Sequence, residues 1–162
     1  MSSCQYRCLA PALTLCTMLA MGGTARAAKT ITPDAPPTAA EIAAARRALP
    51  GDFKDAERIE HHPPTFTVGL VDLNGDGKAD LIIHFDDPLE CGMQDCSAYA
   101  LLAVPGGYST HAITLALFPP HTTMTVLDSI HHGMHDLRYD HSTYVFRWTG
   151  TAYQGLARQS RE

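Results

Sequence analysis

The chain has 162 residues, of which 45% are hydrophobic and 18% charged, and its formal net charge is −5. This is enough apolar material for one domain with its own core, and the acidic balance argues against nucleic acid or an anionic membrane surface as the partner. No sequence repeat recurs along the chain, which argues against an array of repeated structural units.

The first 27 residues have the features of a secretory signal peptide. Arg7 supplies a positive charge, Cys8–Met21 is an almost uncharged apolar run, and Ala25-Arg26-Ala27 is a small-x-small cleavage pattern. The apolar run is shorter than the roughly 20 residues needed to cross a bilayer, so we expect no membrane anchor in the mature form. Lipidation of Cys16 is the competing outcome, but Leu15 stands where a lipoprotein signal has a small residue. We therefore expect cleavage after residue 27 and a periplasmic or secreted protein.

Cleavage would change the charge and the cysteine content of the chain. Loss of Arg7 and Arg26 would leave 10 basic against 17 acidic residues, a net charge of −7. Of the five cysteines, only Cys91 and Cys96 would remain. Two cysteines in an oxidising compartment predict one disulfide, and their spacing differs from the Cys-x-x-Cys of redox-active pairs.

The mature part is expected to begin with an arm and a helix. Residues 28–37 contain three prolines and little to bury, so we expect an extended, flexible arm. Thr38 and Glu41 have the spacing of a capping box, which predicts a helix start. Pro50-Gly51 is expected to end this helix, and a second short turn could follow over 52–58.

From Thr65 onward the apolar residues recur at every second position, the period of half-buried strands. The runs 65–70 and 81–85 flank a turn rich in Asn, Asp and Gly, so they should pair as a hairpin. Further strands are predicted at 97–104, 108–115, 124–127, 136–139 and 143–148, with a return toward Tyr153. The expected fold is α+β, with one N-terminal helix packed on an antiparallel sheet of about seven strands and one disulfide. It would form a single domain over 38–157, followed by a tail at 158–162.

The connection between the first two predicted strands, DLNGDGKAD, has the ligand spacing of a calcium site. Calcium takes six to eight oxygen ligands, which alternating short acidic side chains in a tight turn can supply. The glycine at position 6 of the motif, Gly77, permits the sharp reversal of the chain. The predicted ligands are Asp72, Asn74, Asp76, the backbone carbonyl of Lys78 (whose side chain can then point away) and Asp80, directly or through water.

An empty turn is the alternative, in which Asp72 and Asn74 only make Asx turns. Against it, three carboxylates crowded into one turn repel one another unless a cation is present. Position 12, where an EF-hand has a bidentate Glu, is Ile83. We therefore expect weak binding, with a dissociation constant of roughly 10⁻⁴–10⁻³ M, which suits a structural ion in a calcium-containing medium.

The flanks of the loop alternate like strands, so Val71–Ile83 (VDLNGDGKADLII) resembles the calcium loops of FG-GAP and VCBS repeats. The resemblance implies the same ligand roles. The propeller of those families needs several blades, whereas this chain has one copy. More widely, the chain is similar to small exported bacterial proteins of unassigned function, a resemblance that implies the fold more than any activity. Its features are the calcium-type hairpin, the Cys91-Gly92 to Cys96 ring, the Gly-x-x-Asp-Leu step at 133–137 and the aromatic hairpin at 144–153.

The stretch His131-His132-Gly133-Met134-His135 contains three of the nine histidines. Imidazoles at positions 131 and 135, with His132 beside them, could share a copper or zinc ion, and Met134 could add a soft ligand for Cu(I). The alternative is a solvated histidine-rich loop between two strands. A periplasmic copper- or zinc-binding protein is thus one alternative function.

Catalysis has less support in the sequence. No Gly-x-Ser-x-Gly elbow or phosphate-binding glycine loop occurs, and both remaining cysteines are expected in the bridge. Asp86, Asp87 and Glu90 could do acid–base work, but a polar strand end and turn explain them more simply. We predict no catalytic residue and keep an envelope hydrolase as an alternative. The leading hypothesis is an exported calcium-binding module with a binding or inhibitor role toward a cell-envelope protein.

Overall fold

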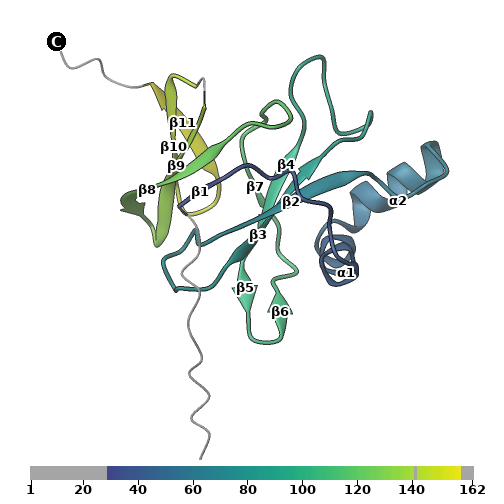
Figure 1. The fold of residues 1–162 in the computed structure, drawn as a ribbon, viewed down its shortest axis with the longest axis horizontal. Coiled ribbons are helices and arrows are strands. Elements are labelled where there is room, and N and C mark those ends of the chain that lie inside the picture. Colours follow the sequence, from purple (N-terminus) through teal and green to yellow (C-terminus); the bar gives the residue numbers. More distant parts are fainter. Residues whose placement is uncertain (1–28, 141, 158–162) are drawn as a thin grey trace, which may run out of the picture.

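The computed structural model of the protein describes residues 29–140 and 142–157 (Figure 1). The predicted signal peptide at 1–27 and the predicted tail at 158–162 lie outside the described residues. Within the described part, no helix is both long and apolar enough to cross a membrane.

Two helices open the fold, where the sequence predicted one helix and a short turn. Helix α1 spans Ala39–Ala48, and α2 spans Pro50–Ile59. The capping box at the start of α1 is confirmed, because Thr38 Oγ1 accepts the Glu41 N–H while the Glu41 carboxylate accepts the Thr38 N–H at 2.7 Å. Pro50-Gly51 was expected to end the first helix, and α1 does end just before it. Pro50 also starts α2, since proline is well suited to the first helical position, where its missing N–H is not needed.

A four-stranded antiparallel sheet, called sheet A here, forms the middle of the molecule in the order β2-β3-β4-β7. Its strands are β2 (Phe66–Val71), β3 (Asp80–Phe85), β4 (Ala98–Leu101) and β7 (Ile113–Thr114). The predicted hairpin is confirmed: β2 and β3 pair along their whole length, with Leu70 opposite Leu81. The strand predicted at 97–104 divides at Leu102 into β4 and a short strand that belongs to a separate ribbon.

A second antiparallel sheet, sheet B, has the order β1-β8-β9-β10-β11. Its strands are β1 (Thr30–Ile31), β8 (Met124–His131), β9 (Met134–Tyr139), β10 (Tyr144–Trp148) and β11 (Tyr153–Ala157). A two-stranded ribbon of β5 (Ala103–Val104) and β6 (Gly107–Tyr108) completes the set. The described residues thus hold eleven strands in three sheets, where the sequence predicted about seven in one. Pro119 and Pro120 stand in the connection from β7 of sheet A to β8 of sheet B. Because they have no N–H to donate to a neighbouring strand, they favour an end of strand pairing at this point.

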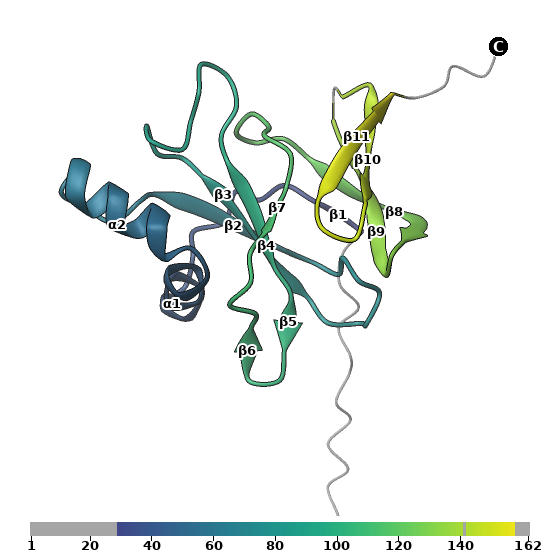
Figure 2. The ribbon, with the colours of Figure 1, turned by 180° about the vertical axis from the view of Figure 1, so that it is seen from behind.

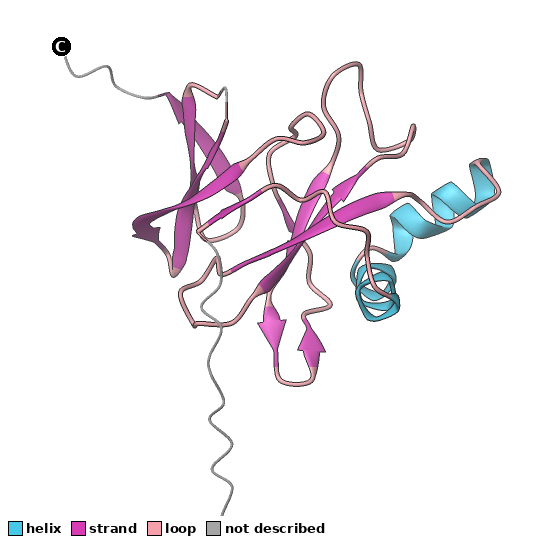
Figure 3. Ribbon diagram, in the orientation of Figure 1, coloured by secondary structure: helices cyan, strands magenta, loops and turns pink. Residues whose placement is uncertain are grey.

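The helices, sheet A and sheet B form three successive layers, as two opposite views show (Figures 1 and 2). The helices lie together at one side of the strands (Figure 3). One core, which includes Phe53 and Ile83, lies between the helices and sheet A. The other core, which includes Ile82 and Leu137, lies between sheet A and sheet B. The α+β class is therefore confirmed, with a second sheet covering the face of sheet A that the helices leave open.

The N-terminal arm is extended but held in place, so the prediction of a flexible arm is corrected. Ile31 pairs with Met124 at the edge of sheet B, and Ala35 exchanges backbone hydrogen bonds with Val68 in sheet A. Gly69 makes this crossing possible, because a Cβ there would lie 3.2 Å from the Pro33 Cα and would overlap the Ile31 side chain. The arm thus links the two sheets.

Candidate functional site

The predicted calcium loop is the turn between β2 and β3, and the Asp72 carboxylate organises it. Asp72 Oδ1 accepts the Gly75 N–H at 2.7 Å, and Oδ2 accepts the Gly77 N–H at 2.9 Å. Both glycines have left-handed backbones, with φ of +74° and +81°, which side chains with a Cβ resist. The glycines therefore let the chain wrap around one carboxylate.

The next two polar residues continue the same pattern. Asn74 Oδ1 accepts the Asp76 N–H at 3.0 Å, and Asp76 Oδ1 accepts the Lys78 N–H at 2.8 Å. The Lys78 ammonium lies 3.1 Å from Asp76 Oδ2, so its side chain turns back to the loop, although a ligating backbone carbonyl would leave it able to point away. The hydrogen bond from the Lys78 backbone, and then its ammonium, lower the pKa of Asp76.

Asp80 differs from the other acidic residues of the loop because it is fully buried. Its Oδ2 accepts the Leu73 N–H at 2.8 Å, and its Oδ1 accepts the Ala103 N–H of β5 at 2.7 Å. Burial raises the pKa of Asp80, the two backbone hydrogen bonds partly offset this, and the negative charges of Asp72 and Asp76 raise it further. Asp80 thus links the turn to β5 by hydrogen bonds, and its carboxylate is close enough to those of Asp72 and Asp76 for electrostatic repulsion.

The loop also contacts sheet B. The Leu73 side chain is completely buried. The backbone carbonyl of Leu73 accepts the backbone N–H of His135 in β9 at 2.8 Å. His135 Nε2 lies close to Gly75, where a Cβ would be 3.4 Å from it. The loop therefore joins β3, β5 and β9, and its order affects how sheet A meets sheet B.

The oxygen atoms of the loop are the kind of ligand that a hard cation prefers, but the carboxylates of the loop do not converge on one point. Calcium–oxygen distances of 2.3–2.6 Å require that two ligand oxygens lie within about 5 Å of each other. Among the described residues, the one group of three His, Cys, Asp or Glu with ligand atoms within 4.8 Å of one another lies elsewhere. The carboxylates of Asp72, Asp76 and Asp80 are thus close enough for their charges to interact, but they do not converge on one point, and Asp80 is buried in the core.

The histidines predicted as alternative metal ligands do not share a site. Across the β8–β9 hairpin His131 pairs with Met134 and Ile130 pairs with His135, so His131 and His135 point to opposite faces. An i, i+4 pair shares a face on a helix, but a two-residue hairpin turn between strands separates it. His132 is exposed and occupies that turn with a left-handed φ of +50°. The prediction of one metal held by His131, His132 and His135 is therefore corrected.

His131 has another partner, the buried Asp136. Its Nδ1 lies 2.8 Å from Asp136 Oδ1, and Ser129 Oγ donates to Asp136 Oδ2 at 2.7 Å. A nucleophilic triad requires the serine to bond the imidazole, with the carboxylate on the other ring nitrogen. Here both Ser129 and His131 bind the carboxylate, so this group lacks the order of a hydrolase triad.

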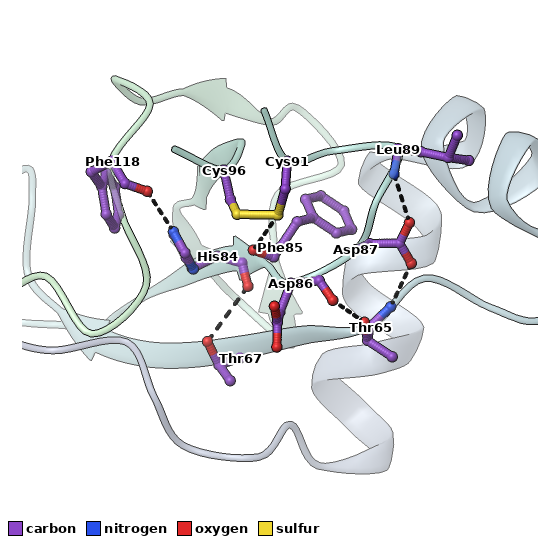
Figure 4. Close-up of a disulfide and its surroundings, with 10 residues drawn as sticks. All are labelled: Thr65, Thr67, His84, Phe85, Asp86, Asp87, Leu89, Cys91, Cys96 and Phe118. Atoms are coloured by element: carbon purple, nitrogen blue, oxygen red, sulfur yellow. Dashed lines mark hydrogen bonds between the residues drawn. A yellow bond between two sulfur atoms is a disulfide. The ribbon is translucent and has the colours of Figure 1, made fainter. Parts of the chain in front are cut away.

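The predicted disulfide between Cys91 and Cys96 is confirmed (Figure 4). The ring that it closes carries Met93, whose side chain is completely exposed. Leu89 and Leu117, exposed by 42% and 62%, line the same shallow depression beside the disulfide. These three apolar side chains, the disulfide-loop surface, are open to solvent in this chain.

Sequence reasoning missed a third group, formed by Glu60, His62 and Asp87. Their ligand atoms all lie within 4.8 Å of one another. The local signal for the first two was Glu-x-His at the end of a helix, which is weak by itself. No sequence signal connected them to Asp87, which follows β3 and comes near only because sheet A packs on the helices.

Comparisons with protein-family models, with curated proteins and with solved structures found no match for the chain. Its function is therefore argued from its own residues.

Proposed function

We propose that the protein is an exported calcium-binding module in which the ion orders the β2–β3 turn. The ligands are the side chains of Asp72, Asn74 and Asp76 and the backbone carbonyl of Lys78, with Asp80 reached through water. All are hard oxygen donors, as calcium prefers. Export to a periplasmic or extracellular space fits the signal-peptide pattern and the Cys91–Cys96 disulfide.

The observation that carries this proposal is the environment of Asp80. The buried Asp80 carboxylate is repelled by the negative charges of Asp72 and Asp76. This repulsion lowers the stability of the loop unless a cation compensates the three charges. The Lys78 ammonium partly does so at Asp76, but this pair is exposed and therefore weak. A divalent ion between the loop oxygens would neutralise the same charges more fully. Because the loop contacts β5 and β9, the ion would be structural for the whole domain.

Thermal unfolding with calcium and with a chelator tests the proposal. For a dissociation constant of 10⁻⁴–10⁻³ M, about 10 mM calcium stabilises the folded state by roughly 1.4–2.7 kcal/mol, which raises Tm by several degrees. Asp76→Ala should abolish the rise. Lys78→Ala should increase it, since the variant lacks the ammonium that competes for Asp76. Asp86→Asn, an exposed carboxylate outside the loop, serves as the matched control and should respond like the wild type. Equal Tm values with calcium and with chelator would refute a calcium site.

We further propose that the module binds a cell-envelope protein, as an inhibitor would, through the disulfide-loop surface. Support comes from Leu89, Met93 and Leu117, which lie exposed around a ring held rigid by the disulfide. Exposed apolar side chains that share one depression are typical of protein interfaces. The acidic charge of the domain favours a basic partner.

Affinity capture from an envelope fraction tests this binding role. The wild type should retain a defined envelope protein in stoichiometric amount, and Met93→Glu should lose it because a charge enters the apolar contact. Ile59→Glu changes an exposed apolar side chain on α2, outside the disulfide-loop surface, and should retain the same protein. Equal capture by both variants would place the interface elsewhere.

A further inference from the structure

Glu60, His62 and Asp87 meet where α2 ends beside the end of β3. Glu60 caps the C-terminus of α2, and His61 then adopts a left-handed backbone with φ of +64°. This conformation is uncommon for a residue with a side chain, and it reverses the chain after the helix. The reversal brings the His62 ring back toward Glu60, with His62 Nε2 3.8 Å from Glu60 Oε2.

The His62 ring is held in the orientation of a metal ligand. Its Nδ1 lies 2.8 Å from the Pro63 carbonyl, which can only accept, so Nδ1 carries the proton. In the neutral ring, Nε2 then presents a lone pair toward the carboxylates. Histidines that bind metals usually donate their other N–H to a backbone carbonyl or carboxylate in this way. The 3.8 Å separation is also too long for a hydrogen bond between His62 and Glu60.

Asp87 is fixed in the same manner by backbone donors. It is 1% exposed, and its two oxygens each accept one backbone N–H at 3.2 Å, from Thr65 and from Leu89 (Figure 4). Each carboxylate oxygen keeps a second lone pair, so these bonds orient the group and leave it able to bind an ion. Carboxylates that ligate metals are commonly supported by such outer hydrogen bonds.

Glu60 supplies the feature that requires a ligand. Its Oε2 is shielded from solvent and accepts no hydrogen bond from any residue that the structure describes. Burial, and then a hydrogen bond and charge repulsion with the neighbouring Asp87 carboxylate, raise the pKa of Glu60. A buried carboxylate oxygen without a donor is costly. The two carboxylates can share at most one proton, whereas a cation would satisfy both of them and the imidazole lone pair, all of which lie within 4.8 Å.

We propose that Glu60, His62 and Asp87 bind a divalent transition ion of the zinc class. One imidazole nitrogen with two carboxylate oxygens suits zinc, whereas calcium takes six to eight oxygens. Three protein ligands leave a fourth position for water, and the His62 side chain, 53% exposed, is the part of the group that reaches solvent. The site shares no residue with the calcium loop, so it does not depend on the proposed function.

Zinc titration of the purified protein, without a polyhistidine tag and with calcium present, tests the site. We expect one zinc ion per chain at this site. His62→Ala and Glu60→Gln should each weaken binding at least tenfold, since even changes outside the ligand shell cost 10- to 100-fold. His121→Ala and His132→Ala remove exposed histidines elsewhere and should bind zinc like the wild type. Asp76→Ala, which lacks a calcium ligand, should also bind zinc unchanged.

The fold of each variant is checked by near-ultraviolet circular dichroism. Glu60→Gln keeps the shape of the side chain, and His62 is exposed, so both variants should remain folded. Zinc affinity that is unchanged in both, or that falls equally in His132→Ala, would overturn the proposal and assign the uptake to surface histidines.

Discussion

His84 is a buried histidine in β3, between the two sheets. Its Nε2 lies 3.0 Å from the Phe118 carbonyl, and its ring stacks on the Phe118 ring with centroids 4.6 Å apart. Figure 4 shows this contact with Phe118, and because the carbonyl only accepts, we assign the proton to Nε2 of the neutral ring. Burial lowers the pKa of His84 below its ordinary value of 6.5, although the bond to Phe118 and the charge of Asp86 oppose this.

The lowered pKa of His84 predicts a loss of stability in mild acid. Below pH 6.5 the unfolded chain takes up a proton that the folded His84 resists, so the free energy of unfolding falls as pH decreases. Well above pH 6.5 His84 is neutral in both the folded and the unfolded chain, so its protonation no longer lowers the free energy of unfolding. His84→Gln keeps an N–H donor but does not titrate.

We therefore expect the Tm of the wild type to fall relative to that of His84→Gln as pH decreases from 7.5 to 5. Comparing the two proteins cancels the acidic groups that they share, such as Asp80, whose raised pKa acts in the opposite direction. A Tm difference that stays constant over this range would contradict the prediction.

At the scale of elements, β3 is buried on both faces. All six of its residues are buried, although the alternating pattern predicted a half-buried strand. Ile82 belongs to the core between the sheets, and Ile83 to the core beneath the helices. A near-continuous apolar run is what a strand covered on both sides requires.

The two cores predict independent effects of Ile82→Val and Ile83→Val. Each should lower the free energy of unfolding by about 0.5–1.5 kcal/mol, because each removes one buried methylene group. Their effects should add, since the side chains occupy different cores. Leu70→Val, at a partly exposed position near the end of β2, should change the free energy by less than about 0.5 kcal/mol. Chemical denaturation of the wild type, the three single variants and the double variant Ile82→Val/Ile83→Val measures these effects, and a near-zero effect at either isoleucine would contradict the three-layer arrangement.

At the scale of the whole molecule, the two sheets share a hydrophobic core and are also linked through the backbone at a few points. The N-terminal arm crosses from sheet B to sheet A over Gly69, and the β2–β3 turn contacts β9 through Leu73. A cation bound in that turn would therefore act on the junction between the sheets. The proposed zinc site lies at another junction, where Asp87 after β3 meets the end of α2.

The sequence by itself determined the features that depend on neighbouring residues. The capping box at Thr38 and the β2–β3 hairpin were predicted, because their contacts span a few positions along the chain. The Asx turns of the loop belonged to the alternative of an empty turn. The spacing of Asp72, Asn74 and Asp76 also led to the prediction of a calcium site, which stays a prediction. The pairing of Cys91 with Cys96 followed from composition, since no other cysteines were expected in the mature chain.

Only the tertiary structure decided which residues meet across the layers. Asp80 accepts an N–H from Ala103, Asp87 lies beside Glu60, and His131 and His135 face apart. The period of apolar residues shows which side of an element is buried, but not which other element covers it. That choice depends on how the faces of sheet A pack against the helices and sheet B, and these contacts join residues far apart in the sequence.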